Sequence, residues 1–180
     1  MIYGERIRLR AVERHDLPRF VGWLNDPEVT AGLLLYLPLS QADEEDWFDQ
    51  MYKQPADQHP MMIEVHSQEN WTPIGDCGFN AIDYHNRSGE IGIFIGQKDQ
   101  WNQGYGSEAM CLLLKHGFNT LNLHRIFLRV HETNKRAIRS YEKAGFVHEG
   151  RLRQAQFRNG KYEDVLLMSV LRPEWQEQTK

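Results

Sequence analysis

Cysteine, long apolar runs and an excess of charge of either sign are all scarce in this sequence. Among its 180 residues the only cysteines are Cys77 and Cys111, and both lie in apolar segments, so a disulfide-stabilised framework is not expected. The formal net charge of −4 at pH 7 provides no overall basic field for a nucleic acid. These scarcities predict a protein of the reducing cytoplasm without a nucleic-acid partner.

A membrane location is not expected either. The longest clearly apolar run, residues 33–39, contains Pro38 and is too short to span a bilayer. The opening MIYGERIRLR places charges where a secretory signal needs an unbroken apolar stretch. A length of 180 residues with 41% hydrophobic residues suffices for one core, and we expect residues 1–180 to form a single domain.

The first third of the sequence predicts one strand and two or three helices. Apolar residues alternate with arginines over 6–10, which is the period-2 pattern of a half-buried strand. They then recur at helical spacing over 17–24, and we expect this helix to end just before Pro27. Ser40, followed three residues later by Asp43, is typical of a capping box that opens another helix.

The rest of the sequence predicts an antiparallel meander and then alternating helices and strands. The β-prone runs of the meander lie at 61–67, 74–84 and 89–96. A helix begins at Gly104, and we expect Cys111 within it to be a small buried side chain. A strand, a helix and two strands should follow at 124–132, 134–144, 146–153 and 162–171. The order βααβββαβαββ is that of a mixed α/β (α+β) domain.

The most informative segment is WNQGYGSEA, in which a polar loop leads into a helix. Gly104 and Gly106 leave room for a ligand to approach the main chain, and the free N–H groups and dipole of the helix start suit a diphosphate. Glycines that only cap a helix are one alternative. A dinucleotide site is another, because GYGSEA fits GxGxxA and Glu132 follows the next strand. That alternative is weakened because seven residues separate Gly96 from Gly104.

Two motifs, WNQGYGSEA and NKRAIRSYEKAGF, resemble the pyrophosphate-binding motif and the N-x-x-A-x-x-x-Y-x-K-x-G-F motif of the GNAT superfamily of acetyltransferases. The segments RIRLRAVERHDL and FVHEGRLRQAQFRNGKYEDVLLMSVL are similar to the branch that holds ribosomal-protein N-terminal acetyltransferases and bacterial polyamine acetyltransferases. One departure is Trp101, which stands where family members often carry Gln or Arg, although Trp is common there in this branch. The resemblance implies a mostly antiparallel central sheet flanked by helices, and an enzyme that moves acetyl from acetyl-CoA to a primary amine.

The resemblance also implies which residues hold acetyl-CoA. The loop and helix start would bind the diphosphate, the preceding strand would offer main-chain groups to the pantetheine arm, and the second motif would add polar side chains. The implied residues are Phe94, Ile95, Asn102, Gln103, Gly104, Tyr105, Gly106, Ser107, Asn134 and Lys143. An N-cap role for Asn134 is an alternative that can hold together with binding. For Lys143 we favour a solvated helix charge.

Moving acetyl from sulfur to nitrogen needs a group that takes a proton from the amine and a group that gives one to the thiolate. By resemblance the donor is Tyr141, for which packing on the apolar face of its helix is the alternative. We expect the acceptor to be Glu90, near the start of the strand that leads into the loop, unless this side chain simply faces solvent. Glu163 and Asp164 are further candidates. No metal is expected, because the eight histidines show no ligand spacing.

The acceptor amine is left open among protein or peptide N-termini, polyamines and other small amines. A polyamine, whose nitrogen has a pKa of about 10.4 and is protonated at neutral pH, would suit the acidic run Asp43, Glu44, Glu45, Asp46 and Asp49. A solvated helix face is the preferred interpretation of that run. A dinucleotide-dependent oxidoreductase and a non-catalytic acyl-CoA sensor remain alternatives. Residues 33–39 are a candidate surface for a homodimer or a cover for the acceptor cleft.

Overall fold

The computed structural model describes residues 1–33, 35–67 and 70–178, and its centre is an eight-stranded sheet of order β1-β2-β3-β4-β5-β6-β8-β7. Of the apolar run 33–39, Leu34 lies outside the described residues. The strands are β1 Ile2–Tyr3, β2 Ile7–Ala11, β3 Met61–Ser67, β4 Asn70–Asp83, β5 Ser88–Ile95, β6 Arg125–His131, β7 Val147–Arg158 and β8 Lys161–Leu171.

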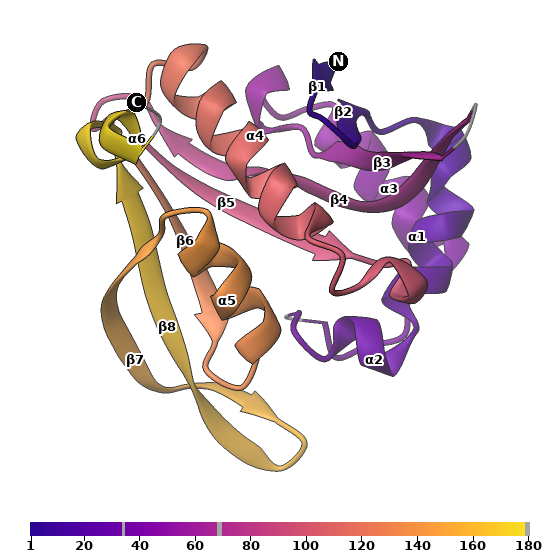
Figure 1. Cartoon of the computed structure of the whole chain (residues 1–180). Helices are drawn as coiled ribbons and strands as arrows, with labels where there is room; N and C mark the ends of the chain where they lie inside the picture. Colours follow the sequence, from indigo (N-terminus) through magenta and orange to yellow (C-terminus); the bar gives the residue numbers. More distant parts are fainter. Residues whose placement is uncertain (34, 68–69, 179–180) are drawn as a thin grey trace.

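Helices lie on both faces of this sheet (Figure 1). They are α1 Leu17–Leu24, α2 Pro27–Thr30, α3 Gln41–Met51, α4 Tyr105–Asn119, α5 Lys135–Lys143 and α6 Arg172–Gln178. None of them, over the ranges that the structure describes, has the length and apolar character that crossing a membrane would require. The mixed α/β fold class with a mostly antiparallel sheet is therefore confirmed.

Two helix ends form where the sequence predicts them. Ahead of α3, the Ser40 hydroxyl accepts a hydrogen bond from the Asp43 N–H at 3.2 Å, and the Asp43 carboxylate accepts one from the Ser40 N–H at 2.8 Å. The Asn134 side chain caps α5 by accepting a hydrogen bond from the Ala137 N–H at 3.1 Å. That helix ends before Gly145, which has a φ of 95°. Local polar chemistry therefore sets these boundaries.

Three features differ from the sequence prediction. β1 was not expected, because two residues are too few to show an alternating pattern. α6 was not expected either, because RPEWQEQ has no apolar stripe at helical spacing. The expectation that Cys111 is buried is wrong: its neighbours Met110 and Leu112 are buried, whereas Cys111 lies on the exposed side of α4.

Two apolar clusters fill the two faces of the sheet. The first lies beneath α4 and α5 and includes Leu113 and Ile138. The second lies beneath α1 and α3 and includes Phe20 and Phe48, packed against Phe94 of β5. The strands at the centre of the sheet are thus covered on both sides, and their alternating side chains belong to different clusters.

The feature that shapes the molecule is the divergence of β5 from β6. These strands pair in parallel only as far as Glu90 opposite Phe127, although β5 continues to Ile95 and β6 continues to His131. Figure 1 shows the two strands separating like a wedge. A register shift in β4 lies opposite Glu90, between Phe79 and Ala81. A bulge bends and twists its strand. We attribute the turn of β5 away from β6 at this level to the bulge in β4, with which β5 pairs.

One residue of the acidic run points into the structure. Glu44 of α3 is buried and faces Asp76 of β4. Burial and the nearby Glu44 carboxylate raise the pKa of Asp76 to about 7. Burial, followed by repulsion from Asp43, also raises the pKa of Glu44. The Glu44 carboxylate and burial therefore both disfavour the charged form of Asp76 beneath α3.

We predict that Asp76→Asn stabilises the protein at high pH. An unfolded Asp has a pKa of about 3.9, so the folded state holds a proton that the unfolded state releases, and stability falls as pH rises from about 4 to about 7. Asn does not ionise, so the advantage of the variant over the wild type should grow by about 2 kcal/mol between pH 5 and pH 8. Urea unfolding at both pH values measures this difference.

The matched control is Asp46→Asn, which changes an exposed carboxylate of α3, the helix that carries Glu44. Its stability relative to the wild type should not depend on pH. An Asp76→Asn variant whose advantage is the same at pH 5 and pH 8 would contradict the assigned ionisation.

Candidate active site

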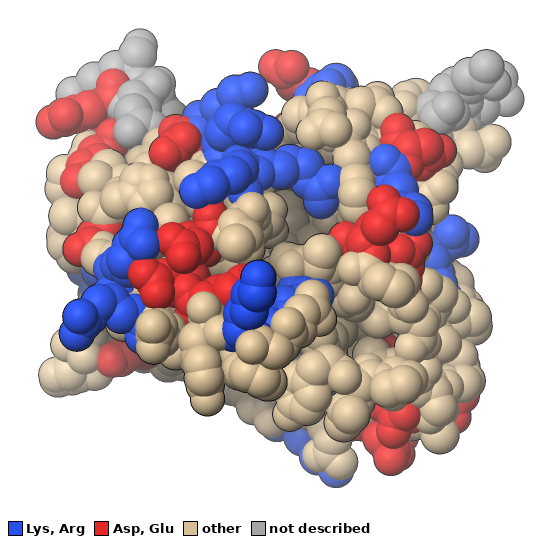
Figure 2. Space-filling model, turned by 90° about the horizontal axis from the view of Figure 1, so that it is seen from below, with Lys and Arg blue, Asp and Glu red and all other residues tan. Residues whose placement is uncertain are grey.

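A cleft of about 1150 Å³ occupies the wedge between β5 and β6. Its walls come from β5 and β6, from the starts of α4 and α5, and from the segment after α2, while part of β7 forms its lower side. Figure 2, which views the molecule from below, shows lysine and arginine side chains gathered beside a hollow. The basic residues of the cleft lining are Arg129, Lys135, Arg136, Arg139 and Lys143.

The start of α4 is an open anion site at one end of this cleft. Gly104 takes the left-handed conformation with a φ of 87°, and no side chain caps the helix. The main-chain N–H groups of residues 102–107 donate no hydrogen bond within the described part of the chain. Unsatisfied donors at a helix start, together with the positive end of the helix dipole, favour a phosphate or diphosphate group.

The loop before α4 is held by contacts that the sequence did not reveal. The Arg6 guanidinium donates to the Glu108 carboxylate at 2.9 Å and to the Gln103 carbonyl at 3.0 Å. The Trp101 indole N–H donates to the Ile95 carbonyl at 2.7 Å. Trp101 therefore fixes the loop against the end of β5 through its side chain, and the main-chain N–H groups of residues 102–107 stay free.

The second motif forms the opposite wall of the cleft. Arg136 of α5 stacks on the Trp101 ring, with the guanidinium carbon 3.7 Å from the ring centre, and burial lowers the pKa of Arg136. The hydroxyls of Ser107 and Ser140 lie 2.8 Å apart and join the start of α4 to the second half of α5. Asn134 caps α5 and also lines the cleft, so both roles considered for it are compatible with the geometry.

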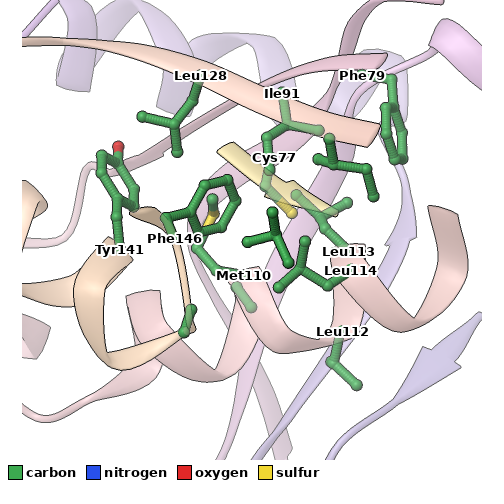
Figure 3. Packing of buried hydrophobic residues seen from close by; sticks show 14 of the residues in the cluster. Cys77, Phe79, Ile91, Met110, Leu112, Leu113, Leu114, Leu128, Tyr141 and Phe146 are labelled. Carbon is green, nitrogen blue, oxygen red and sulfur yellow. The ribbon is translucent and has the colours of Figure 1, made fainter. Parts of the chain in front are cut away.

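Tyr141 lies where the core meets the cleft. Its ring packs 6.0 Å from that of Phe146, and Figure 3 shows its hydroxyl at the edge of the apolar cluster. The hydroxyl makes no hydrogen bond to any residue that the structure describes. Burial raises the pKa of Tyr141 to about 12, so the phenol stays protonated and can donate a hydrogen bond into the cleft.

The carboxylates considered as proton acceptors are already engaged. Both Glu90 oxygens accept hydrogen bonds from Arg129, at 2.8 and 3.2 Å. Asp164 accepts from the Arg151 guanidinium at 2.9 Å and from the Gln154 N–H at 2.8 Å. Of these carboxylates only Glu90 lines the cleft, where its side chain is held by the Arg129 guanidinium.

The structure places the predicted site residues as follows. Gln103 does not line the cleft, because its side chain donates to the Asp99 carbonyl at 2.7 Å. The other predicted residues all line it: Glu90, Phe94, Ile95, Asn102, Gly104, Tyr105, Gly106, Ser107, Asn134, Tyr141 and Lys143. The acidic run of α3 does not, and its preferred interpretation as an outer helix face agrees with the exposure of all its members except Glu44.

Several lining residues were missed. Gly32, Asn80, Arg129 and His131 belong to no motif, and Arg136 stands at an unspecified position of the second motif. Gly32 carries a spatial requirement, since a Cβ there would lie 2.3 Å from the Asn134 amide nitrogen. A single loop glycine gives no such signal in one sequence, because the close approach comes from the Asn134 side chain about one hundred residues later.

Comparison with known proteins agrees with this geometry. The chain is 32% identical to the uncharacterized N-acetyltransferase p20 of Bacillus licheniformis, over 97% of both chains. It is also 32% identical to the spermidine N(1)-acetyltransferase of Vibrio cholerae, over 96% of both. A crystal structure of the spermidine N-acetyltransferase from Vibrio cholerae in complex with CoA and spermine matches with a TM-score of 0.87 and 28% identity, covering 96% of this chain and 99% of that one.

A comparison with protein-family models also identifies an acetyltransferase. The model described as an acetyltransferase (GNAT) domain matches residues 6–147, which include β5, β6 and both motifs. Together with the uncapped start of α4 beside a buried, protonated Tyr141, these matches lead to one conclusion. The chain belongs to the GNAT family of acetyltransferases.

Proposed function

We propose that this chain is a single-domain, acetyl-CoA-dependent N-acetyltransferase of the cytoplasm that acetylates a primary amine. The observation that carries the proposal is the group of free N–H donors at residues 102–107, which opens into the wedge that contains Tyr141. A coenzyme diphosphate suits those donors, and the edge of β5 that β6 leaves unpaired beyond Glu90 suits the amide groups of a pantetheine arm. Acetyl-CoA supplies the activated thioester.

Tyr141 is proposed to stabilise the departing sulfur. A thiol has a pKa of about 8.5 in water, and burial in apolar surroundings raises that value. The same burial raises the pKa of Tyr141 to about 12. The phenol therefore stays neutral over the working pH range, and it donates a hydrogen bond as negative charge develops on sulfur.

The charges of the cleft favour an amine of low basicity, such as the α-amine of a peptide or protein. The acidic residues of its lining are Glu28 and Glu90, which are paired with Lys98 at 2.9 Å and with Arg129 at 2.8 Å. A polycation would have to displace these partners. A peptide α-amine has a pKa of about 7.7–8.0 and is largely free near neutral pH.

A polyamine is the second candidate acceptor. It is favoured by the likeness to spermidine N-acetyltransferases over nearly the whole chain. The two candidate acceptors make different demands on the site. A polyamine nitrogen, with a pKa of about 10.4, needs more carboxylates around it and a stronger general base than a peptide α-amine does.

We predict that acetyl-CoA raises the melting temperature and that NAD does not. At a ligand concentration of one hundred times Kd the stabilisation is about 2.7 kcal/mol, which corresponds to about 5–10 °C for a chain of this size. Gly104→Ala should reduce this shift, because it places a side chain at a φ of 87° beside the diphosphate donors. Differential scanning fluorimetry measures both effects.

Gly160→Ala is the matched control. Gly160 also has a positive φ, of 76°, but it lies in the β7–β8 turn with no atom near its would-be Cβ. Its backbone strain should lower stability similarly, while the acetyl-CoA shift stays as in the wild type. A larger shift with NAD than with acetyl-CoA would favour the oxidoreductase alternative.

We predict that Tyr141→Phe lowers kcat about 100-fold while the thermal shift with acetyl-CoA stays unchanged. The substitution removes the hydroxyl but keeps the ring that packs against Phe146. Free CoA thiol, measured against time, gives the rate. Tyr162→Phe, at an exposed tyrosine outside the cleft, should leave it unaltered, and an unchanged rate in Tyr141→Phe would remove the proposed role.

We predict that a panel of amines ranks short peptides above spermidine by at least about tenfold in kcat/KM, because of their lower amine pKa. The readout is again release of free CoA. The reverse order would select the polyamine candidate. Binding of acetyl-CoA without release of CoA, whatever amine is added, would identify an acyl-CoA sensor instead of an enzyme.

A further inference from the structure

His131, the last residue of β6, has an unexplained environment. Its side chain is only 5% exposed, and its Nδ1 atom is fully buried without a hydrogen-bond partner. Among the described residues, Asp57 is the only other one with such an atom. A buried polar atom without a partner is uncommon in native proteins and calls for an explanation.

The side chain lies on the face of the sheet opposite to Tyr141. Alternate residues of β6 point to opposite faces, and Leu128 and Val130 belong to the cluster beneath α4 and α5, which includes Tyr141. Arg129 and His131 therefore point to the other face. Because both Tyr141 and His131 line the wedge, a thioester held there would have the phenol on one side and the imidazole on the other.

A carboxylate stands behind the imidazole. His131 lies opposite Val165 in the β6–β8 ladder, so Glu163 is its diagonal neighbour on the same face. The Glu163 Oε2 atom lies 3.8 Å from Nδ1 and is held by the Thr133 hydroxyl, which donates to it at 3.2 Å. The 3.8 Å separation is too long for a hydrogen bond, so Glu163 acts on the ring through its charge.

The other ring nitrogen faces the cleft. Nε2 makes no hydrogen bond within the described residues and is not among the fully buried atoms, so it has access to the cleft that His131 lines. With its proton on Nδ1, directed at Glu163, the neutral ring presents a lone pair on Nε2. The Glu90 carboxylate, by contrast, is engaged through both oxygens in its ion pair with Arg129.

The charges around the ring keep it neutral. Burial lowers the pKa of His131, the Glu163 carboxylate opposes this effect, and the Arg158 guanidinium adds to it. The charged groups that line this side of β6 are Glu163 of β8, Arg158 of β7, the Arg129–Glu90 pair of β6 and β5, and Glu28 of α2. At pH 7 the imidazole is thus able to take up a proton.

We propose that His131 is the general base of the acetyl transfer, with Glu163 as its positioning residue. The inference rests on the proposed N-acetyltransferase function. Nε2 takes one proton from the incoming ammonium group, the nitrogen forms a bond to the acetyl carbon, and the carbon–sulfur bond breaks. The second proton reaches the thiolate through Tyr141 or solvent, and the imidazolium releases its proton to solvent. The sum is ammonium plus thioester giving amide, thiol and one proton.

The test compares His131→Gln with Glu163→Gln, using the best amine of the panel. His131→Gln should lower kcat/KM for the amine at least about 100-fold while the acetyl-CoA thermal shift is kept. The wild-type profile should fall on the acid side of the ordinary imidazole pKa of about 6.5, because burial lowers the pKa of His131. In His131→Gln, kcat/KM should instead rise with pH through the pKa of the amine, because without the base only the unprotonated amine can react.

Glu163→Gln should lower kcat/KM about tenfold and move the fall to lower pH, because the carboxylate that raises the pKa of His131 is lost. His124→Gln is the matched control. His124 is exposed, precedes the same strand and lies outside the cleft, so its rate and profile should equal those of the wild type.

Two results would overturn the proposal. One is an unchanged rate and pH profile in His131→Gln. The other is loss of the acidic fall of the kcat/KM profile in Glu90→Gln instead of in His131→Gln. If His131→Gln does not fold, ¹⁵N spectra of the wild type decide the question: a neutral ring with its proton on Nδ1 supports the proposal, and a proton on Nε2 overturns it. An active wild type with either overturning result refutes only this inference, whereas no CoA release with any amine refutes the proposed function.

Discussion

The short parallel pairing of β5 with β6 is the constraint on which the rest of the structure depends. The two strands are held together only as far as Glu90 and Phe127, and beyond that level each strand keeps an edge without a partner in the ladder. Unpaired main-chain groups inside a domain are costly unless water or a ligand satisfies them. The divergence therefore creates both the space and the hydrogen-bonding capacity of the cleft.

The surroundings of the wedge preserve this opening. Trp101 binds the end of β5 through the Ile95 carbonyl, and Arg6 ties the first turn of α4 to β2 through Glu108. These contacts fix the loop without using the N–H groups of residues 102–107. The start of α4 is thus rigid in position yet unsatisfied in hydrogen bonding, which is the combination that an anion site needs.

The two faces of the sheet give the cleft two different chemical sides. Tyr141 reaches it from the apolar cluster beneath α5, where burial keeps the phenol protonated. His131 reaches it from the opposite face, where burial keeps the imidazole neutral. The same physical cause, loss of water around an ionisable group, keeps the phenol protonated and the imidazole unprotonated, which are the states that the two proposed roles require.

Local sequence specifies the helix caps at Ser40 and Asn134, the meander and the order of most elements, because these depend on neighbours within a few positions. The cleft residues of the two motifs were predicted from the resemblance of those motifs to GNAT acetyltransferases. The sequence could not place Gln103 outside the cleft or Glu90 in its ion pair with Arg129. Those outcomes, like the pairing of His131 with Glu163, were decided only by tertiary structure. They arise where strands distant in sequence meet in register, and no local spacing specifies that meeting.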